Sequence, residues 1–186
     1  MSMNRMLAAL AFAAFALCGC APHYYGDDLR ASMDAPYRLA SGDRLRVIVF
    51  GQENLTNSFA VDGAGNVAMP LIGLVHAQGL TTAELASSLE ARLRGGYLRE
   101  PKVSVEVEAF RPFFVLGEVG SSGQYPFVNG MTAQTAVAIA GGFSPRGEQN
   151  GVDITRNIDG KPATAYVPLN FPVRPGDTVT VRERFF

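Results

Sequence analysis

The sequence predicts an α+β chain made of two consecutive units, each with one principal helix among short strands. Two observations lead to this prediction. Threonines at positions 81 and 132 each precede a run with helical spacing of apolar residues, and the flanking segments alternate apolar and polar residues as strands do. A chain of 186 residues has room for one large or two small domains. Its two cysteines lie near the N-terminus, so both units must be held by their hydrophobic cores.

The N-terminus has the layout of a bacterial secretory signal, predicted over residues 1–19. A single charge, Arg5, precedes an apolar run from Met6 to Leu17 that is too short to be a permanent bilayer span. The run ends in Leu-Cys-Gly-Cys, which resembles a lipobox, in which the last cysteine is diacylated and becomes the new N-terminus. We therefore predict lipidation at Cys20. Ala21 in place of Asp favours sorting to the outer membrane, by resemblance to sorted bacterial lipoproteins.

Other interpretations of the two cysteines are weaker. A plain secretory signal would end in an Ala-x-Ala-like site, which is absent here. A disulfide between Cys18 and Cys20 is disfavoured by their spacing. A closed zinc site needs four ligands, and only His23 lies nearby.

Composition limits the classes of function that the chain could have. The formal net charge is −1, and removal of the signal would also remove one basic residue, Arg5. No basic excess indicates nucleic-acid binding. After residue 20 no apolar run reaches eighteen residues, so the sequence predicts no further transmembrane helix. Residues 20–36 contain scattered proline, glycine and aspartate and are predicted to form the lipidated N-terminus and a tether.

The first unit is predicted over residues 37–110. Apolar and charged residues alternate over 44–49, and a tight turn is expected at 62–66. Thr81 and Glu84 form a capping box, followed by Leu85, Leu89 and Leu93 on one helix face and by a stop at 95–96. A strand with one solvent-exposed face is expected over 103–109.

The second unit is predicted over residues 111–186. Strands are expected at 113–119, 125–128, 153–156, 164–168 and 178–182, with turns at 120–123 and 157–160. Thr132 is expected to cap the helix, which ends at Gly141-Gly142. A weak internal echo links the units, because Gly42-Asp43 and Gly176-Asp177 both precede an x-apolar-x-Val strand start. A shared turn, in which Asp accepts backbone hydrogen bonds, is favoured over a functional role for either aspartate.

A series of short motifs runs along both units in a fixed order: Tyr37-Arg38-Leu39, Gly42-Asp43, Val61-Asp62-Gly63, Met69-Pro70-Leu71-Ile72-Gly73, Gly79-Leu80-Thr81, Pro101-Lys102-Val103, Gly117-Glu118-Val119, Ala140-Gly141-Gly142-Phe143 and Pro175-Gly176-Asp177. The order of these motifs resembles the outer-membrane polysaccharide export protein family. The first unit is similar to its polysaccharide-export domain, and the second to the soluble ligand-binding β-grasp domain that follows in the family. The chain stops soon after the last strand, where large ring-forming members carry further repeats and a C-terminal membrane helix, so it resembles the short members.

The resemblance implies a function. We expect a non-enzymatic, lipid-anchored component of an exopolysaccharide or capsule export channel, facing the periplasm from the outer membrane. Its expected partners are the polysaccharide, further copies of the chain in a ring, and an inner-membrane polymerisation and chain-length protein. The alternative is an outer-membrane-tethered module that binds a saccharide or small ligand. No cofactor or metal is expected.

Four residues are candidates for contacts with the polymer, a ligand or a neighbouring subunit. Arg44 and Arg46 project from the exposed face of the first strand and could meet an acidic polymer or a neighbour's carboxylate, or could simply be a solvated edge. Glu118 and Tyr125, with the Gly141-Gly142 backbone, are candidates for a ligand. Tyr125 could instead be a core or hairpin aromatic, and the glycines a helix C-cap.

An enzyme that hydrolyses or cleaves the polymer is a third hypothesis, and it is disfavoured. A glycosidase needs a pair of carboxylates across a cleft, and Asp62, Glu84 and Glu118 are the available acids. Asp62 is better explained by its turn and Glu84 by its capping box. His76 lies in an apolar strand context and is expected to be packed. The sequence contains no nucleophile-elbow, metal or phosphate-loop motif.

Overall fold

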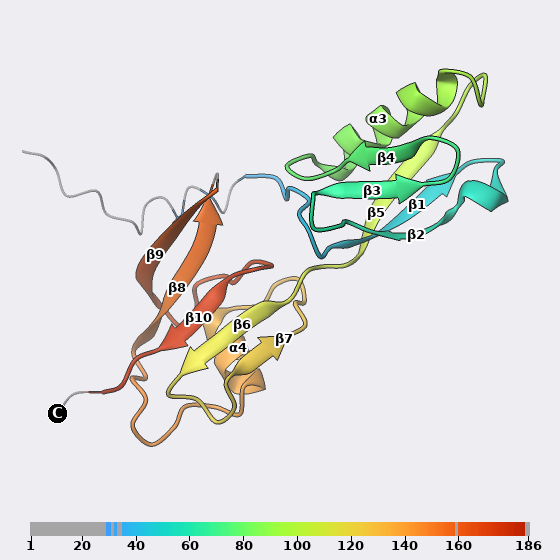
Figure 1. Cartoon of the computed structure of the whole chain (residues 1–186). Coiled ribbons are helices and arrows are strands. Elements are labelled where there is room, and N and C mark those ends of the chain that lie inside the picture. The colour runs from blue at the N-terminus through green and yellow to red at the C-terminus, as the bar shows by residue number, and fades with distance from the viewer. Residues whose placement is uncertain (1–28, 31, 33–34, 159, 185–186) are drawn as a thin grey trace, which may run out of the picture.

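The computed structural model describes residues 29–30, 32, 35–158 and 160–184. It shows two groups of strands, each with a helix, joined by the chain between β5 and β6 (Figure 1). This confirms the predicted α+β class. The first unit contains β1 (Arg44–Val49), the 3-10 turn η2 (Glu53–Leu55), β2 (Asn57–Ala60), β3 (Asn66–Met69), β4 (Gly73–His76), α3 (Thr82–Arg94) and β5 (Val103–Ala109). The second unit contains β6 (Phe113–Gly117), β7 (Gly123–Tyr125), α4 (Ala133–Ile139), β8 (Gly151–Ile158), β9 (Lys161–Pro168) and β10 (Thr178–Val181).

The first unit is built on an antiparallel sheet in the order β2-β1-β5, with β3 and β4 forming a separate hairpin. Strict alternation on β1 buries Leu45, Val47 and Val49 and leaves Arg44 and Arg46 exposed. These valines and leucine pack with the apolar face of α3 into one hydrophobic cluster.

Helix α3 follows its sequence signals closely. The Thr81 hydroxyl accepts a hydrogen bond from the backbone N–H of Glu84, and the Glu84 carboxylate accepts one from the N–H of Thr81, which confirms the capping box. Leu85, Leu89 and Leu93 are fully buried, and Gly95 is the C-cap. The helix therefore begins, ends and faces the core as the spacing of the residues predicts.

The second unit is a five-stranded mixed sheet in the order β7-β6-β10-β8-β9. β6 and β10 are parallel, and every other pair is antiparallel. Helix α4 is capped by Thr132, with Thr135 completing a capping box. A second hydrophobic cluster contains Phe113, Val115, Ile154, Val179 and the buried alanines of α4.

Two local expectations are wrong. The strand predicted at 125–128 instead spans Gly123–Tyr125, because these residues pair with β6, while Pro126, the next residue, has no N–H to continue the ladder. His76 is exposed rather than packed, because β4 alternates and Val75 takes the inward position. The hydrophobic context of His76 reflects its neighbours along the chain and not its own environment.

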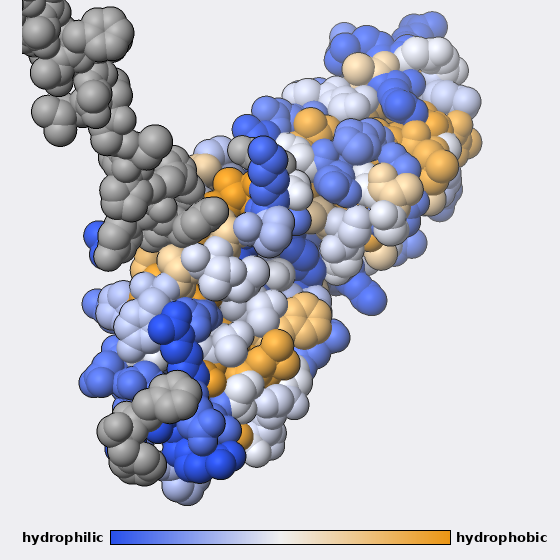
Figure 2. All heavy atoms as spheres, turned by 60° about the vertical axis from the view of Figure 1, so that its left-hand side comes forward, coloured by the Kyte–Doolittle hydropathy of each residue, from blue (hydrophilic) through white to orange (hydrophobic). Residues whose placement is uncertain are grey.

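The surface is mainly polar, with scattered apolar side chains. Figure 2 shows a face on which hydrophilic residues surround several small hydrophobic patches. The exposed large apolar residues are Phe50, Leu71, Leu74, Tyr97, Phe114, Leu116, Val128, Ile139 and Tyr166. In the described part of the chain, neither α3 nor α4 has the length and apolar character of a membrane-spanning helix.

Candidate contact surfaces and the junction between the units

The predicted lipidation residue, Cys20, lies outside the residues that the structure describes. The other candidates fall in three separate places. Arg44 and Arg46 lie on the outer face of the first sheet, Glu118 follows β6, and Tyr125 ends β7. The structure also brings together a set of residues at the junction between the units.

Arg44 and Arg46 lie on the middle strand of the β2-β1-β5 sheet, so the interpretation of them as a solvated sheet edge is wrong. Strand β5 places Glu106 directly opposite Arg46 in the register. Neither guanidinium forms an ion pair or hydrogen bond among the described residues. Both charges are therefore available on the open face of the sheet.

Arg46 also borders a shallow hollow of about 430 Å³ at the end of β1. The hollow is open to solvent, and Phe50 at its rim is 63% exposed. An exposed aromatic side chain beside an arginine provides both an apolar surface and a cation. The remaining lining residues are Ile48, Val49, Gly51, Gln52, Glu53 and Thr56.

Glu118 is half-buried and is engaged by the loop that follows α4. Its carboxylate accepts a hydrogen bond from the Ser144 hydroxyl (2.6 Å) and lies 3.4 Å from a nitrogen of Arg146. Its backbone carbonyl accepts a hydrogen bond from the N–H of Ser144. Glu118 thus links the turn after β6 to the loop that follows α4.

Tyr125 packs its ring beside Phe113, with 6.0 Å between centroids, and its hydroxyl donates to the carbonyl of Ser121 (2.6 Å). At the glycines, the close approach is between two segments of the chain's own backbone. A Cβ on Gly120 would lie 2.8 Å from the Gly141 carbonyl oxygen, so the two backbones pass in direct contact. In this geometry the Tyr125 side chain and the contact between Gly120 and Gly141 both contribute to packing of the β6–β7 turn against the end of α4.

The junction is organised by Asp43, whose side chain is fully buried. One carboxylate oxygen accepts hydrogen bonds from the Tyr37 hydroxyl (2.7 Å) and the N–H of Ala40 (2.9 Å). The other accepts from the N–H of Arg111 (2.9 Å), in the connection between the two units. The Arg111 guanidinium lies 3.5 Å from Asp43 and donates to the Tyr37 hydroxyl. A buried carboxylate with this many donors is well compensated.

Aromatic rings continue this junction into the second unit. Phe110 makes edge-to-face contacts with Tyr37 (5.0 Å between centroids) and with Phe127 (5.5 Å). Burial, followed by the hydrogen bond to Asp43, raises the pKa of Tyr37 far above its ordinary value, so its hydroxyl keeps the donated proton. The connection between β5 and β6 is thus packed on both sides.

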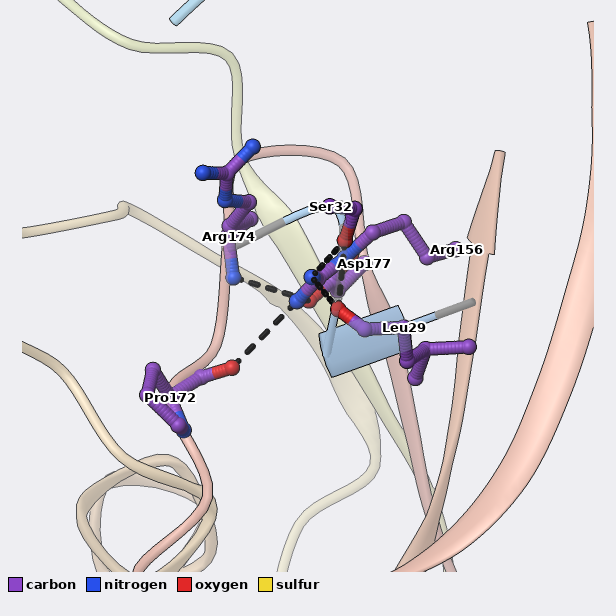
Figure 3. Close-up of polar contacts among 6 residues, drawn as sticks. All are labelled: Leu29, Ser32, Arg156, Pro172, Arg174 and Asp177. Carbon is purple, nitrogen blue, oxygen red and sulfur yellow. Dashed lines mark hydrogen bonds and ion pairs between the residues drawn. The ribbon is translucent and has the colours of Figure 1, made fainter. Parts of the chain in front are cut away.

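The second Gly-Asp turn repeats the first. The Asp177 carboxylate accepts from the N–H of Arg174, three residues earlier, as Asp43 does from Ala40. It also receives two hydrogen bonds from the Arg156 guanidinium, at 2.9 and 2.7 Å, in a buried ion pair (Figure 3). Both Gly-Asp positions therefore support the favoured interpretation, in which the aspartate accepts backbone hydrogen bonds of a turn. Each aspartate also forms an ion pair with an arginine.

Arg111 contacts both of these turns. A Cβ on Gly176 would lie 2.6 Å from the Arg111 side-chain nitrogen Nε, and Gly176 has a φ of +84°. Only glycine fits this backbone conformation without strain, and it also leaves room for the arginine. The two Gly-Asp turns and Arg111 therefore meet where the units join.

Sequence reasoning did not single out Arg111 or Arg156. For Arg156 a signal exists, because Val152 and Ile154 are inward positions of β8, and the period of two places the next inward side chain at Arg156. A charged residue at an inward strand position needs a buried partner. Arg111 follows the last strand of the first unit, and its contacts depend on residues distant in sequence.

Comparison with known proteins gives a consistent result. Residues 31–108 match the family model described as polysaccharide biosynthesis/export protein. The chain is similar to the exopolysaccharide production protein ExoF of Rhizobium meliloti (strain 1021), with 30% identity over 133 residues, which cover 65% of this chain and 31% of that protein. It is also similar to the EPS I polysaccharide export outer membrane protein EpsA of Ralstonia nicotianae, with 26% identity over 185 residues, covering 80% of this chain and 48% of EpsA. The chain thus spans less than half the length of these relatives.

Proposed function

We propose that this chain, which belongs to the polysaccharide export protein family, is a lipid-anchored component of an exopolysaccharide or capsule export channel on the periplasmic side of the outer membrane. The observation that carries the proposal is the family match over residues 31–108. That stretch contains the helix, all but the last residue of the strands, and the core cluster of the first unit.

The proposal assigns a role to each part of the chain. Residues 1–19 are the signal peptide, and Cys20 carries the lipid at the start of the 20–36 segment. Residues 37–110 form the polysaccharide-export domain, and residues 111–186 form a β-grasp-like domain. The similarity to EpsA, an outer membrane export protein by its name, supports the location.

In this proposal the protein carries out no bond chemistry and assembles with further copies into a ring. The open face of the first sheet supports such contacts, because Arg44 and Arg46 are exposed there and form no ion pair or hydrogen bond with any residue that the structure describes. The hollow beside Arg46 and Phe50 is suited to contact with a polymer, since sugar faces stack on aromatic rings. An inner-membrane polymerisation and chain-length protein would supply the polysaccharide.

A clean gene deletion tests the export role. We expect surface polysaccharide to be lost, with polymer retained inside the cell or its synthesis stopped, and a copy of the wild-type gene to restore it. Normal surface polysaccharide in the deletion strain would refute the proposal. Complementation with a Cys20→Ser variant tests the anchor separately, and we expect this variant to leave the membrane fraction.

A further inference from the structure

Three connections of the first unit lie together at the end of that unit that is farthest from the second unit. Val49, the last residue of β1, pairs with Val103, the first residue of β5, and β3 runs antiparallel to β2. The segment after β1, the β3–β4 turn and the segment after α3 therefore share this end, opposite the junction at Asp43 (Figure 1). We name this end the tip and define it as residues 50–56, 70–74 and 92–102.

Large apolar side chains gather at the tip. Leu71, Leu74 and Tyr97 are 57%, 58% and 53% exposed, and they come from two separate segments of the chain. A hydrogen bond from the Arg92 guanidinium to the Leu74 carbonyl (2.7 Å) joins the start of β4 to the last turn of α3. Phe50 is exposed at the same end, where it borders the hollow at the end of β1. Figure 2 shows hydrophobic residues beside hydrophilic ones here. Apolar side chains that gather in this way are a mark of interaction surfaces, whereas scattered ones are ordinary.

The backbone holds one of these side chains in a strained conformation. Leu71 has a φ of +72°, and it is the only non-glycine residue with a positive φ in the part of the chain that the structure describes. Glycine or asparagine adopts this conformation with less strain than leucine does. A leucine here is therefore unfavourable for the turn itself and also leaves an apolar side chain in water. Contact with a partner explains this choice of residue better than folding does.

The tip carries an excess of positive charge. Its charged residues are all exposed, four cations against two carboxylates, in a chain whose formal net charge is −1: Arg92, Arg94, Arg99, Lys102, Glu53 and Glu100. The side chains of Arg94, Arg99 and Lys102 form no ion pair or hydrogen bond with any residue that the structure describes. This balance is complementary to a surface on which carboxylates outnumber cations.

We propose that the tip binds a partner protein that presents an apolar pocket bordered by carboxylates. Leu71 and Leu74 enter the pocket together with the Tyr97 ring, and the arginines at positions 94 and 99 pair with the carboxylates around it. The inference goes beyond the proposed export role and does not depend on the lipid anchor.

A protein fits this surface better than a lipid or a saccharide does. The turn fixes the Leu71 backbone in advance, which lowers the cost of ordering on binding and suits a pocket of definite shape. An anionic lipid surface would repel Glu53 and Glu100, which lie among the cations, whereas a protein can offer each charge its own partner. Leucine side chains have no ring face on which a sugar could stack.

Photo-cross-linking in the cells that naturally produce the protein tests the surface. The photoreactive residue p-benzoylphenylalanine is introduced at position 97 or, as the control, at position 128, where Val128 is an exposed side chain of the second unit. We expect position 97 to form an adduct with one protein other than this chain, in a segment where Asp and Glu outnumber Lys and Arg. Mass spectrometry of the adduct identifies that segment. An adduct with another copy of the chain, an adduct with a lipid, no adduct, or the same adduct from position 128 overturns the proposal.

Leu71→Asn separates binding from folding. Asparagine relieves the backbone strain and removes the apolar side chain. We expect the purified variant to be at least as stable as wild type in urea, and the yield of the adduct at position 97 to fall about tenfold or more, as on loss of a central apolar contact. The matched control is Leu116→Asn, at an exposed leucine of β6, which should leave the yield unchanged. An undiminished adduct in Leu71→Asn would overturn the proposal.

Charge reversal tests the carboxylates of the partner. We expect Arg94→Glu, Arg99→Glu to reduce the adduct, and exchange of carboxylates for lysines in the cross-linked segment of the partner to restore it. Failure of that exchange to restore the adduct refutes a carboxylate-bordered site. A chain that proves dispensable for surface polysaccharide can still form the adduct, so this inference and the proposed function fail separately.

Discussion

Asp43 shows how one side chain can join distant parts of the sequence. Its carboxylate accepts hydrogen bonds from Tyr37, Ala40 and Arg111, and the last of these lies 68 positions further along the chain. The sequence predicted the local part of this arrangement, because Gly-Asp before a strand is a turn signal. It could not predict Arg111, since no periodic pattern links a turn residue to a connection that follows five strands and a helix.

Replacement of Asp43 by asparagine tests the junction. Both carboxylate oxygens of Asp43 accept hydrogen bonds, and the amide nitrogen of Asn cannot accept. We expect Asp43→Asn to lower the free energy of unfolding by about 1–3 kcal/mol, the cost of leaving a buried group unsatisfied. Urea denaturation followed by circular dichroism would measure the change.

Asp62→Asn is the matched control for this substitution. Asp62 is exposed and uses a single oxygen, Oδ1, to accept from the N–H groups of Ala64 and Asn66. An asparagine can present the same oxygen, so we expect little change. If the two variants were equally stable, the buried network at Asp43 would contribute nothing beyond an ordinary turn.

Elements with a strong local signal were predicted well. Helix α3 has a capping box, a leucine stripe and a glycine stop, and all three appear where expected. The hairpin of β8 and β9 was predicted around its turn but is longer than expected, with strands over Gly151–Ile158 and Lys161–Pro168. The short strand β7 was misplaced by two residues at its start, because a three-residue strand has too little alternation to fix its position.

The capping box of α3 predicts an acid-dependent contribution to stability. The backbone N–H of Thr81 donates to Glu84 and, with the Thr81 side chain and Arg38, lowers the pKa of Glu84. A lowered pKa in the folded state stabilises the protein above the unfolded value of about 4.3, and this contribution is lost as the pH falls through the folded pKa.

Glu84→Gln removes the charge and keeps an acceptor. We therefore expect wild type to be more stable than this variant at pH 7, with the difference shrinking as the pH falls below the unfolded value. Urea midpoints at a series of pH values would show it. The control is Glu100→Gln, at an exposed glutamate after α3. A gap between wild type and Glu84→Gln that persists unchanged into acid would contradict the electrostatic account.

At the scale of the molecule, the two units are linked in more ways than the sequence indicates. Composition and periodicity predict two units but treat the connection and the N-terminal segment as spacers. The structure instead shows Phe110 and Arg111 packed between the units, and Leu29 buried in the second core. Such contacts depend on tertiary packing, which local sequence patterns do not encode.

The open face of the first sheet is the surface on which an assembly prediction can be made. Arg44 and Arg46 project from its middle strand, flanked by β2 and by the acidic residues of β5. If neighbouring copies meet here, the double substitution Arg44→Glu, Arg46→Glu should weaken assembly by setting like charges against each other. The monomer should remain folded, since an unfavourable cross-strand pair with Glu106 costs only about 0.2–1 kcal/mol.

Light scattering after size-exclusion of the detergent-extracted, lipidated protein would measure the assembly directly. The matched control is Arg99→Glu, Lys102→Glu, which makes the same change in net charge at exposed positions between α3 and β5. We expect the control to keep the mass of the wild-type assembly and the double substitution on β1 to reduce it, with a parallel loss of surface polysaccharide. An assembly of unchanged mass, together with normal export, would mean that the two arginines are only solvated.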